Sequence, residues 1–319
     1  MLFRSSPIVG AQKAEKIWRI GVLSADPANS IAGRQILEQF PAALGRIGYR
    51  EGRNIELVWR WTDGSTVNLP ELAMGLVRLP VDIIVARTND PTVAAKNATR
   101  TIPIVMLNGN FPVETGLVKS LTRQGGNVTG TSYLSTETIE KCMQILKEIA
   151  PRVGRVAVLG TIGSANRFGQ TLRAALTHAA DKLRMSVEFY DVQRPEDVAG
   201  VLEKIASSSS DAVYYTGAAA LRTRTEQIMA FLRARKLASI AIIPTFAELG
   251  GLVHYAPDVQ EFYDRTASYV DRILKGAKPA DLPVDQPTKF ELVVNLKTAA
   301  AIGLTIPPSF LVRADRVIK

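Results

Sequence analysis

The chain has 319 residues, 46% of them hydrophobic, and carries a formal net charge of +9. This length suits one large domain or two medium ones, and no apolar run reaches the roughly 18 residues that a membrane-spanning helix needs. Lysines and arginines are spread along the chain with acidic residues between them, which is typical of a solvated basic surface. We therefore expect no nucleic-acid partner.

Few residues are suited to metal binding or catalysis. Cys142, the single cysteine, excludes an intrachain disulfide, and its helical surroundings predict a buried, unreactive thiol. The two histidines, His178 and His254, belong to no cluster with metal-ligand spacing. Neither a nucleophile elbow nor a phosphate-binding loop is present. We expect no cofactor, no metal and no enzymatic activity, and keep a Rossmann-type enzyme as an alternative.

The first residues bear on export. Val9 to Ala11 resembles the small-residue end of a secretory signal, but only Leu2 and Phe3 precede Arg4, so the apolar segment of such a signal is missing. A truncated signal and an ordinary N-terminus without fixed structure both fit this stretch. In either case we expect residues 1–16 to be a disordered remnant outside the fold.

Short apolar runs rich in β-branched residues alternate with stretches of helical period. Apolar residues three and four apart, such as Ile36, Phe40 and Ala43, lie on one face of a helix. Pro41 lies inside this stretch and predicts a kink or a break. The predicted strands are Arg19–Leu23, Ile55–Trp61, Asp82–Ala86, Ile104–Leu107, Val128–Tyr133, Arg155–Leu159, Ser186–Val192, Ala212–Tyr215 and Ile240–Ile243.

These strands form two series, which predicts two parallel sheets covered by helices on both faces. The break falls after Tyr133, where a helix over Ser135–Ile149 leads into the second series. The tail then offers a strand at Leu252–Tyr255, a helix at Gln260–Leu274 and a strand at Phe290–Asn295. Such a tail can complete both sheets in turn. The predicted fold class is α/β with two Rossmann-like lobes.

Polar side chains follow the predicted strands, at the edge where open parallel sheets bind ligands. Hydroxyls and amides orient a small polar ligand, although the same residue types also cap helices. The candidate ligand-binding residues are Ser24, Asp26, Arg87, Thr88, Asn89, Asp90, Asn108, Asn110, Ser132, Thr161, Thr216 and Thr245. We add Tyr255, an aromatic residue near a strand end, as one that stacks on the ligand, with a place in the core as the alternative.

The segment from Arg87 to Pro91 is the most specific of these signals. Pro91 suits the first position of a helix capped by Asp90 or Asn89, which places free N–H groups and the positive end of the helix dipole beside Arg87. Together these groups can receive a carboxylate. The alternative is an ordinary capped helix with Arg87 in a surface ion pair.

Five blocks of the sequence are specific enough to indicate a family. They are Tyr49–Trp61, Ala98–Leu107, Asn108–Gly130, Tyr269–Ala299 and Ile302–Ser309. They resemble the ABC-transporter substrate-binding family that includes tryptophan- and tyrosine-type binding proteins, and the resemblance extends over about residues 19–319. It implies the type I periplasmic-binding-protein fold, with three crossings between two lobes and the ligand between them. Lobe 1 is then expected at 17–132 plus 250–281, and lobe 2 at 133–249 plus 282–319.

The resemblance also implies a function. The chain is expected to be the exported, periplasmic solute-binding component of an ABC importer, a monomer that delivers a small polar or carboxylate-bearing molecule to a membrane permease. An amino acid and an aromatic acid are both candidate ligands. The effector-binding domain of a regulator is a further alternative, but too few residues precede Ile17 for a DNA-binding helix-turn-helix.

The chain departs from the family's usual pattern at the expected cleft. Phe111 stands where the family usually has Asp, and His254 stands where it has Ser. After the strand Ala212–Tyr215 no acidic residue is placed to hold an ammonium group, whereas Arg222 and Arg224 follow. Two arginines beside a cleft favour an anionic ligand, and a solvated helix surface is the other interpretation.

Overall fold

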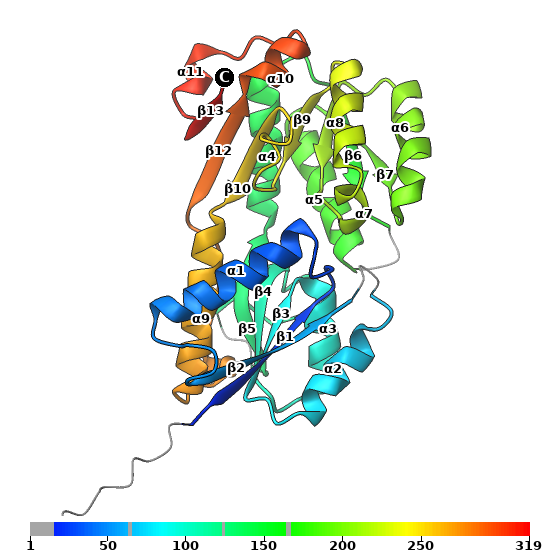
Figure 1. Cartoon of the computed structure of the whole chain (residues 1–319). Coiled ribbons are helices and arrows are strands. Elements are labelled where there is room, and N and C mark those ends of the chain that lie inside the picture. Colours follow the sequence, from blue (N-terminus) through cyan, green and yellow to red (C-terminus); the bar gives the residue numbers. More distant parts are fainter. Residues whose placement is uncertain (1–15, 63–65, 123–124, 164–166) are drawn as a thin grey trace, which may run out of the picture.

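The computed structural model describes residues 16–62, 66–122, 125–163 and 167–319. Two sheets, each flanked by helices, form two lobes stacked one above the other (Figure 1). The candidate export signal at Val9 to Ala11 lies outside the described residues. Within the described residues, no helix has the length and apolar character needed to cross a membrane.

Lobe 1 is built on a parallel sheet in the order β11-β5-β4-β3-β1-β2. Its strands are β1 (Trp18–Ser24), β2 (Ile55–Trp61), β3 (Ile83–Arg87), β4 (Ile104–Asn110), β5 (Val128–Leu134) and β11 (Val284–Asp285). Helices α1 (Ile31–Arg46) and α9 (Val259–Leu274) pack on one face, and α2 (Leu69–Arg78) and α3 (Asn89–Ala98) on the other. Strands buried on both faces explain the continuous apolar runs in the sequence.

Pro41 does not interrupt the first helix, contrary to the expectation from the sequence. Helix α1 begins after the cap Ser30, whose hydroxyl accepts the Gly33 N–H, and continues through Pro41 to Arg46. The apolar face of α1 is buried against the lobe 1 core, and it includes Phe40, the residue directly before the proline. Tertiary packing therefore outweighs the backbone hydrogen bond that proline cannot donate.

Lobe 2 is built on a sheet in the order β13-β12-β10-β9-β8-β6-β7, in which β12 runs antiparallel to β10. Its strands are β6 (Arg155–Gly160), β7 (Ser186–Asp191), β8 (Ala212–Tyr215), β9 (Ala238–Ala241), β10 (Val253–Pro257), β12 (Phe290–Asn295) and β13 (Arg316–Ile318). Its helices are α4 (Thr136–Ile149), α5 (Arg167–Lys182), α6 (Val198–Ser207), α7 (Ala219–Arg222), α8 (Thr225–Ala234), α10 (Leu296–Ala301) and α11 (Pro308–Leu311). The two predicted strand series thus form two sheets, as expected.

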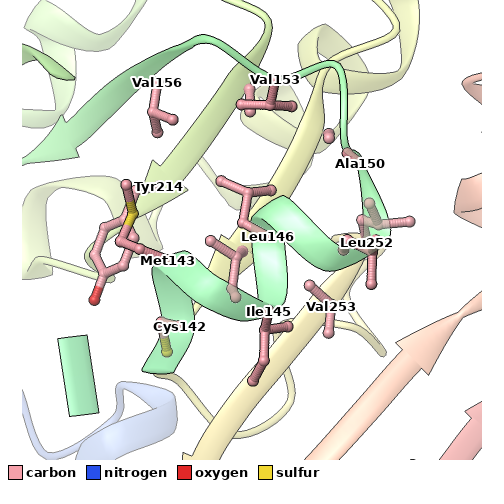
Figure 2. Close-up of a cluster of buried hydrophobic side chains, with 14 of the residues drawn as sticks. Cys142, Met143, Ile145, Leu146, Ala150, Val153, Val156, Tyr214, Leu252 and Val253 are labelled. Carbon is pink, nitrogen blue, oxygen red and sulfur yellow. The ribbon is translucent and has the colours of Figure 1, made fainter. Parts of the chain in front are cut away.

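The core of lobe 2 contains the single cysteine. Helix α4 packs its apolar face against the sheet, and Figure 2 shows Cys142 and Leu146 of this helix among residues of β8 and β10. Cys142 is fully buried, and burial raises the pKa of its thiol, so the protonated form is favoured. The expectation of a buried thiol is confirmed, and the raised pKa disfavours the reactive thiolate.

The chain passes between the lobes at three places. The crossings follow β5, β10 and β11, so the C-terminal region completes both sheets in turn as predicted. The second crossing comes after Pro257 rather than at 250, because β10 pairs with β9 and β12 in the lobe 2 sheet. The third comes after Asp285 rather than at 282, because β11 pairs with β5 in lobe 1.

Each of the three crossings leaves the carboxyl end of a strand. Because the strands of lobe 1 are parallel, the carboxyl ends of β1, β3 and β4 also point toward lobe 2. The same argument applies to β6, β8 and β9 in lobe 2. The loops that follow these strands therefore face each other across the boundary between the lobes.

Candidate functional site

A buried ion pair lies at the lobe 1 edge of this boundary. Arg87 ends β3 opposite Ser24 of β1, and its Nη1 donates to Oδ2 of Asp26 in the loop after β1. The side chains of Arg87 and Asp26 are 9% and 8% exposed. Arg87 is therefore not part of a surface ion pair. Removing a charged pair from water to this depth costs free energy, and buried charges are concentrated at functional sites.

Arg222 of lobe 2 reaches the same carboxylate. Its Nη2 lies 2.8 Å from Oδ1 of Asp26, and its side chain is 35% exposed. Arg222 belongs to α7, the short helix that follows β8, and joins the two lobes through this contact. Arg224, two residues further on, is exposed. The sequence drew attention to both arginines without deciding between the cleft and a solvated helix, and the structure separates them.

Buried polar atoms without a partner gather around this group. Among the described residues, six buried side-chain N or O atoms have no hydrogen bond, and four of them lie at or just after the carboxyl ends of strands that point to the boundary. They are Nε of Arg87, Oδ1 of Asn108, Oδ1 of Asn110 and Oγ1 of Thr216. A buried polar atom without a partner costs about 1–3 kcal/mol, so the set indicates a place where a ligand supplies hydrogen bonds.

Backbone strain is concentrated at the same edge. Among the described residues, four of the six non-glycine residues with positive φ come at or after strand ends. They are Thr88 (70°), Asn108 (62°), Phe111 (47°) and Thr245 (73°). Such conformations cost of the order of 1–3 kcal/mol each and cluster at ligand-binding sites. This observation supports the boundary between the lobes as the functional site.

Several predicted residues are used to build the edge of lobe 1. The Asn89 amide donates to the carbonyl of Asn110 (2.9 Å) and accepts its N–H (2.7 Å). The hydroxyl of Ser24 accepts the Asp26 N–H at 3.2 Å, and that of Thr88 donates to the Arg87 carbonyl at 2.6 Å. These side chains fix the strand ends at Arg87 and Asn110 and the loop that carries Asp26.

The predicted start of the third helix is wrong by two residues. Helix α3 begins at Asn89 with Thr88 as its cap, so Pro91 occupies the third helical position and Asp90 is exposed in the first turn. The cap makes no side-chain hydrogen bond, since the Thr88 hydroxyl is engaged by a carbonyl. The helix N-terminus still lies directly beside Arg87.

Other candidates have partners within their own region. The Thr161 hydroxyl donates to the carbonyl of Val192 at 2.7 Å and ties the ends of β6 and β7 together. Ser132 is buried and donates to the Leu134 carbonyl at 3.4 Å, whereas Thr245 is exposed. Of the lobe 2 candidates, Thr216 thus keeps a buried atom free for a ligand.

The ring of Tyr255, which the sequence predicts to stack on a ligand, packs against another aromatic ring of lobe 2. Its ring stacks on Phe290 at 4.8 Å between centroids, and its backbone carbonyl accepts from the Cys142 thiol at 3.8 Å. It lies within β10, next to β12, and packs on the lobe 2 core. The apolar residues around β10 and β12 account for the packing of the Tyr255 ring on the core.

Two tyrosines that the sequence did not single out lie at the boundary. Tyr133, at the first crossing, donates its hydroxyl to the Ile242 carbonyl of lobe 2 at 2.5 Å, and burial raises its pKa while Arg87 and Arg222 oppose the rise. Burial likewise raises the pKa of Tyr263 in α9, against the positive charge of Arg87. Both hydroxyls stay protonated. Both tyrosines lie in strand-like or helix-like patterns of apolar residues, which predict core positions. The sequence therefore carries no signal that identifies them as residues of the site.

An apolar contact also joins the lobes. Phe111, from the lobe 1 loop after β4, is 1% exposed and packs within the lobe 2 core cluster. Its ring centroid lies 6.3 Å from that of Phe168 in α5. Phe111, at the position where the family usually has an acid, thus provides an apolar surface between the lobes.

A cavity of about 220 Å³ lies beside two of the three segments that cross between the lobes. It is lined by Ser132, Tyr133, Ser135, Glu137, Thr138, Gln286, Pro287 and Phe290, from the first and third crossings. We place the candidate site at the arginines instead, because the buried charges and unpaired polar atoms lie there. Within the described part of the chain, no group of three His, Cys, Asp or Glu side chains is arranged to hold a metal ion.

Comparisons with known proteins identify a family and agree with the two-lobed fold. The family model for the ABC transporter substrate binding protein matches residues 31–318. The tyrosine-binding protein of Clostridioides difficile (strain R20291) is 26% identical over 266 residues, which cover 83% of this chain and 75% of that protein.

Two solved structures share the two-lobed fold. A conserved domain protein from Vibrio cholerae O1 biovar El Tor strain N16961 has a TM-score of 0.87 and 27% identity, covering 95% of this chain and 100% of that one. An ABC domain from Streptococcus pneumoniae, in complex with L-Trp, has a TM-score of 0.86 and 24% identity, with the same coverage.

Proposed function

Because the chain belongs to the ABC transporter substrate binding protein family, we propose that it is the solute-binding component of an ABC importer. The family consists of solute-binding proteins and not of enzymes. The proposed ligand is a small polar or carboxylate-bearing molecule held between the two lobes.

The observation that carries this proposal is the contact between Asp26 and Arg222. It joins the facing edges of the two lobes at 2.8 Å, directly beside Arg87 with its unpaired Nε. A ligand at this point touches both lobes and stabilises the arrangement in which they meet. Binding then shifts a population of open molecules toward the closed form by rotation about the three crossings.

The proposed binding residues come from both lobes. Lobe 1 contributes Asp26, Arg87, Asn108 and Asn110, and lobe 2 contributes Arg222 and Thr216. One chain supplies both sides of the site, so we propose that it acts as a monomer. Its proposed partner is a membrane permease, and its proposed location is the periplasm after export.

The direct test is a thermal-shift screen with amino acids and with aromatic and aliphatic carboxylates. A solute that binds the native state alone raises the apparent melting temperature. Tyrosine and tryptophan are tested first, because the relatives described above are a tyrosine-binding protein and a protein in complex with L-Trp.

Small-angle scattering then decides the mechanism. A saturating solute is expected to reduce the radius of gyration and to be recovered chemically unchanged. Conversion of the solute into a product would contradict the proposal, and a constant radius despite tight binding would remove the hinge mechanism.

A further inference from the structure

Asp26, Arg87 and Arg222 form one charged group between the lobes, with a net charge of +1. Asp26 contributes one negative charge, and Arg87 and Arg222 contribute one positive charge each. The side chains of Asp26 and Arg87 are more than nine-tenths buried. At this depth an uncompensated charge interacts strongly with its surroundings, because little water is present to screen it. A ligand that carries one negative charge makes the group neutral.

The acidic residue of this group is already engaged on both oxygens. Oδ2 of Asp26 accepts from Arg87, and Oδ1 accepts from Arg222. An ammonium group brought to Asp26 would also face both guanidinium groups and be repelled by them. A zwitterionic amino acid would leave the net charge at +1. The same molecule without its amino group would reduce it to zero.

The unpaired atoms around the group suit the same kind of ligand. Nε of Arg87 is a buried donor without an acceptor, and a carboxylate is the acceptor that a guanidinium binds best. The free Oδ1 atoms of Asn108 and Asn110 accept a hydroxyl or N–H group but supply no negative charge. Phe111 and Phe168 pack on each other across the same boundary, and Phe111 is 1% exposed, so these rings contribute no further charge to the group.

Resting on the proposed function, the geometry points to a monocarboxylate without an α-ammonium group as the preferred class of ligand. Arg87 and Arg222 are the residues that determine this preference, with Asp26 holding both in place.

The test compares pairs of molecules that differ only in the amino group. Binding of 3-phenylpropanoate and phenylalanine, and of 4-methylpentanoate and leucine, is measured by calorimetry at pH 7 on the full chain. The carboxylate of at least one pair is expected to bind about tenfold more tightly than its amino acid, and 2-phenylethylamine is expected not to bind. Equal or tighter binding of both amino acids overturns the inference and leaves the proposed function standing.

A variant assigns the preference to the arginines. Arg222→Gln lowers the net charge of the group to zero and is expected to reduce the discrimination between carboxylate and amino acid to less than about threefold. Arg224→Gln is the matched control, because this neighbouring arginine is exposed, and it is expected to keep the discrimination. An unchanged preference in Arg222→Gln overturns the assignment. If neither carboxylate binds, the inference fails, and the broader solute screen decides the proposed function separately.

Discussion

The two lobes present different chemistry at their facing edges. Lobe 1 carries the deeply buried Asp26 and Arg87 together with the two amides of Asn108 and Asn110. Lobe 2 contributes the hydroxyl of Thr216 and an arginine that keeps a third of its side-chain surface in solvent. We therefore propose that lobe 1 holds the ligand and that lobe 2 closes over it. The predictions below test this division, starting with the largest expected effect.

The buried charge of lobe 1 makes that lobe sensitive to the loss of Asp26. Asp26→Ala leaves Arg87 buried without its counter-charge, which is expected to lower the free energy of unfolding by about 3–5 kcal/mol. Urea unfolding followed by tryptophan fluorescence measures this in lobe 1, because all three tryptophans lie in β1 and β2.

The control for this change is Asp264→Ala in the same lobe. Asp264 pairs with Arg46 at 2.5 Å, but both side chains are about half exposed, so the loss is expected to stay below about 1 kcal/mol. If the two variants lost similar free energies of unfolding, burial of the Asp26 ion pair would not make it more stabilising than an exposed pair.

Ligand affinity gives the next comparison. Arg87→Gln removes the buried guanidinium with the unpaired Nε and is expected to weaken 3-phenylpropanoate, or another solute identified in the screen, about ten- to a hundredfold. Arg222→Gln is expected to have a smaller effect, because solvent screens its partly exposed side chain. Calorimetry on both variants measures the order. A larger loss in Arg222→Gln would reverse the roles of the lobes.

The sequence could predict most of the site residues at the strand ends of lobe 1, but little of the contact between the lobes. Asp26 and Arg87 follow buried strands, and the rule for parallel sheets locates such residues directly. Arg222 pairs with Asp26, a loop residue of the other lobe that lies far away along the chain, and no local sequence pattern specifies that contact. Likewise, the membership of β10 in lobe 2 depends on its pairing with β9 and β12, which periodicity does not specify.

A pH effect is expected in lobe 2, where both histidines lie. His254 in β10 is fully buried, and burial lowers its pKa in spite of the nearby Glu248. Its folded-state pKa is depressed, so the unfolded chain binds the proton more readily and stability is lost as the pH falls below about 6.5. Each unit of depression contributes at most about 1.4 kcal/mol. Hydrogen exchange at pH 7 and pH 5.5 is expected to show loss of protection in β10 and its neighbours.

Two variants separate His254 from other sources of acid sensitivity. His254→Gln keeps an acceptor for the Ala247 N–H and is expected to flatten the pH dependence, even where it lowers stability at pH 7. His178→Gln is expected to leave the dependence unchanged, because His178 is largely exposed on α5. Acid sensitivity that persists in His254→Gln would exclude this histidine as its source.

The smallest expected effect concerns a single hydrogen bond between the lobes. The Tyr133 hydroxyl donates to the Ile242 carbonyl of lobe 2, whereas the Tyr269 hydroxyl donates to the Pro283 carbonyl within lobe 1. Tyr133→Phe removes a bond that depends on the two lobes being together, so it is expected to weaken solute binding by about 0.5–1.5 kcal/mol, or roughly two- to tenfold. Tyr269→Phe removes a bond of the same kind and is expected to lower the stability of lobe 1 without changing affinity. Calorimetry and urea unfolding on both variants compare the two losses. If Tyr133→Phe changed stability alone, its hydroxyl would be a structural bond of the hinge rather than part of the closure that accompanies binding.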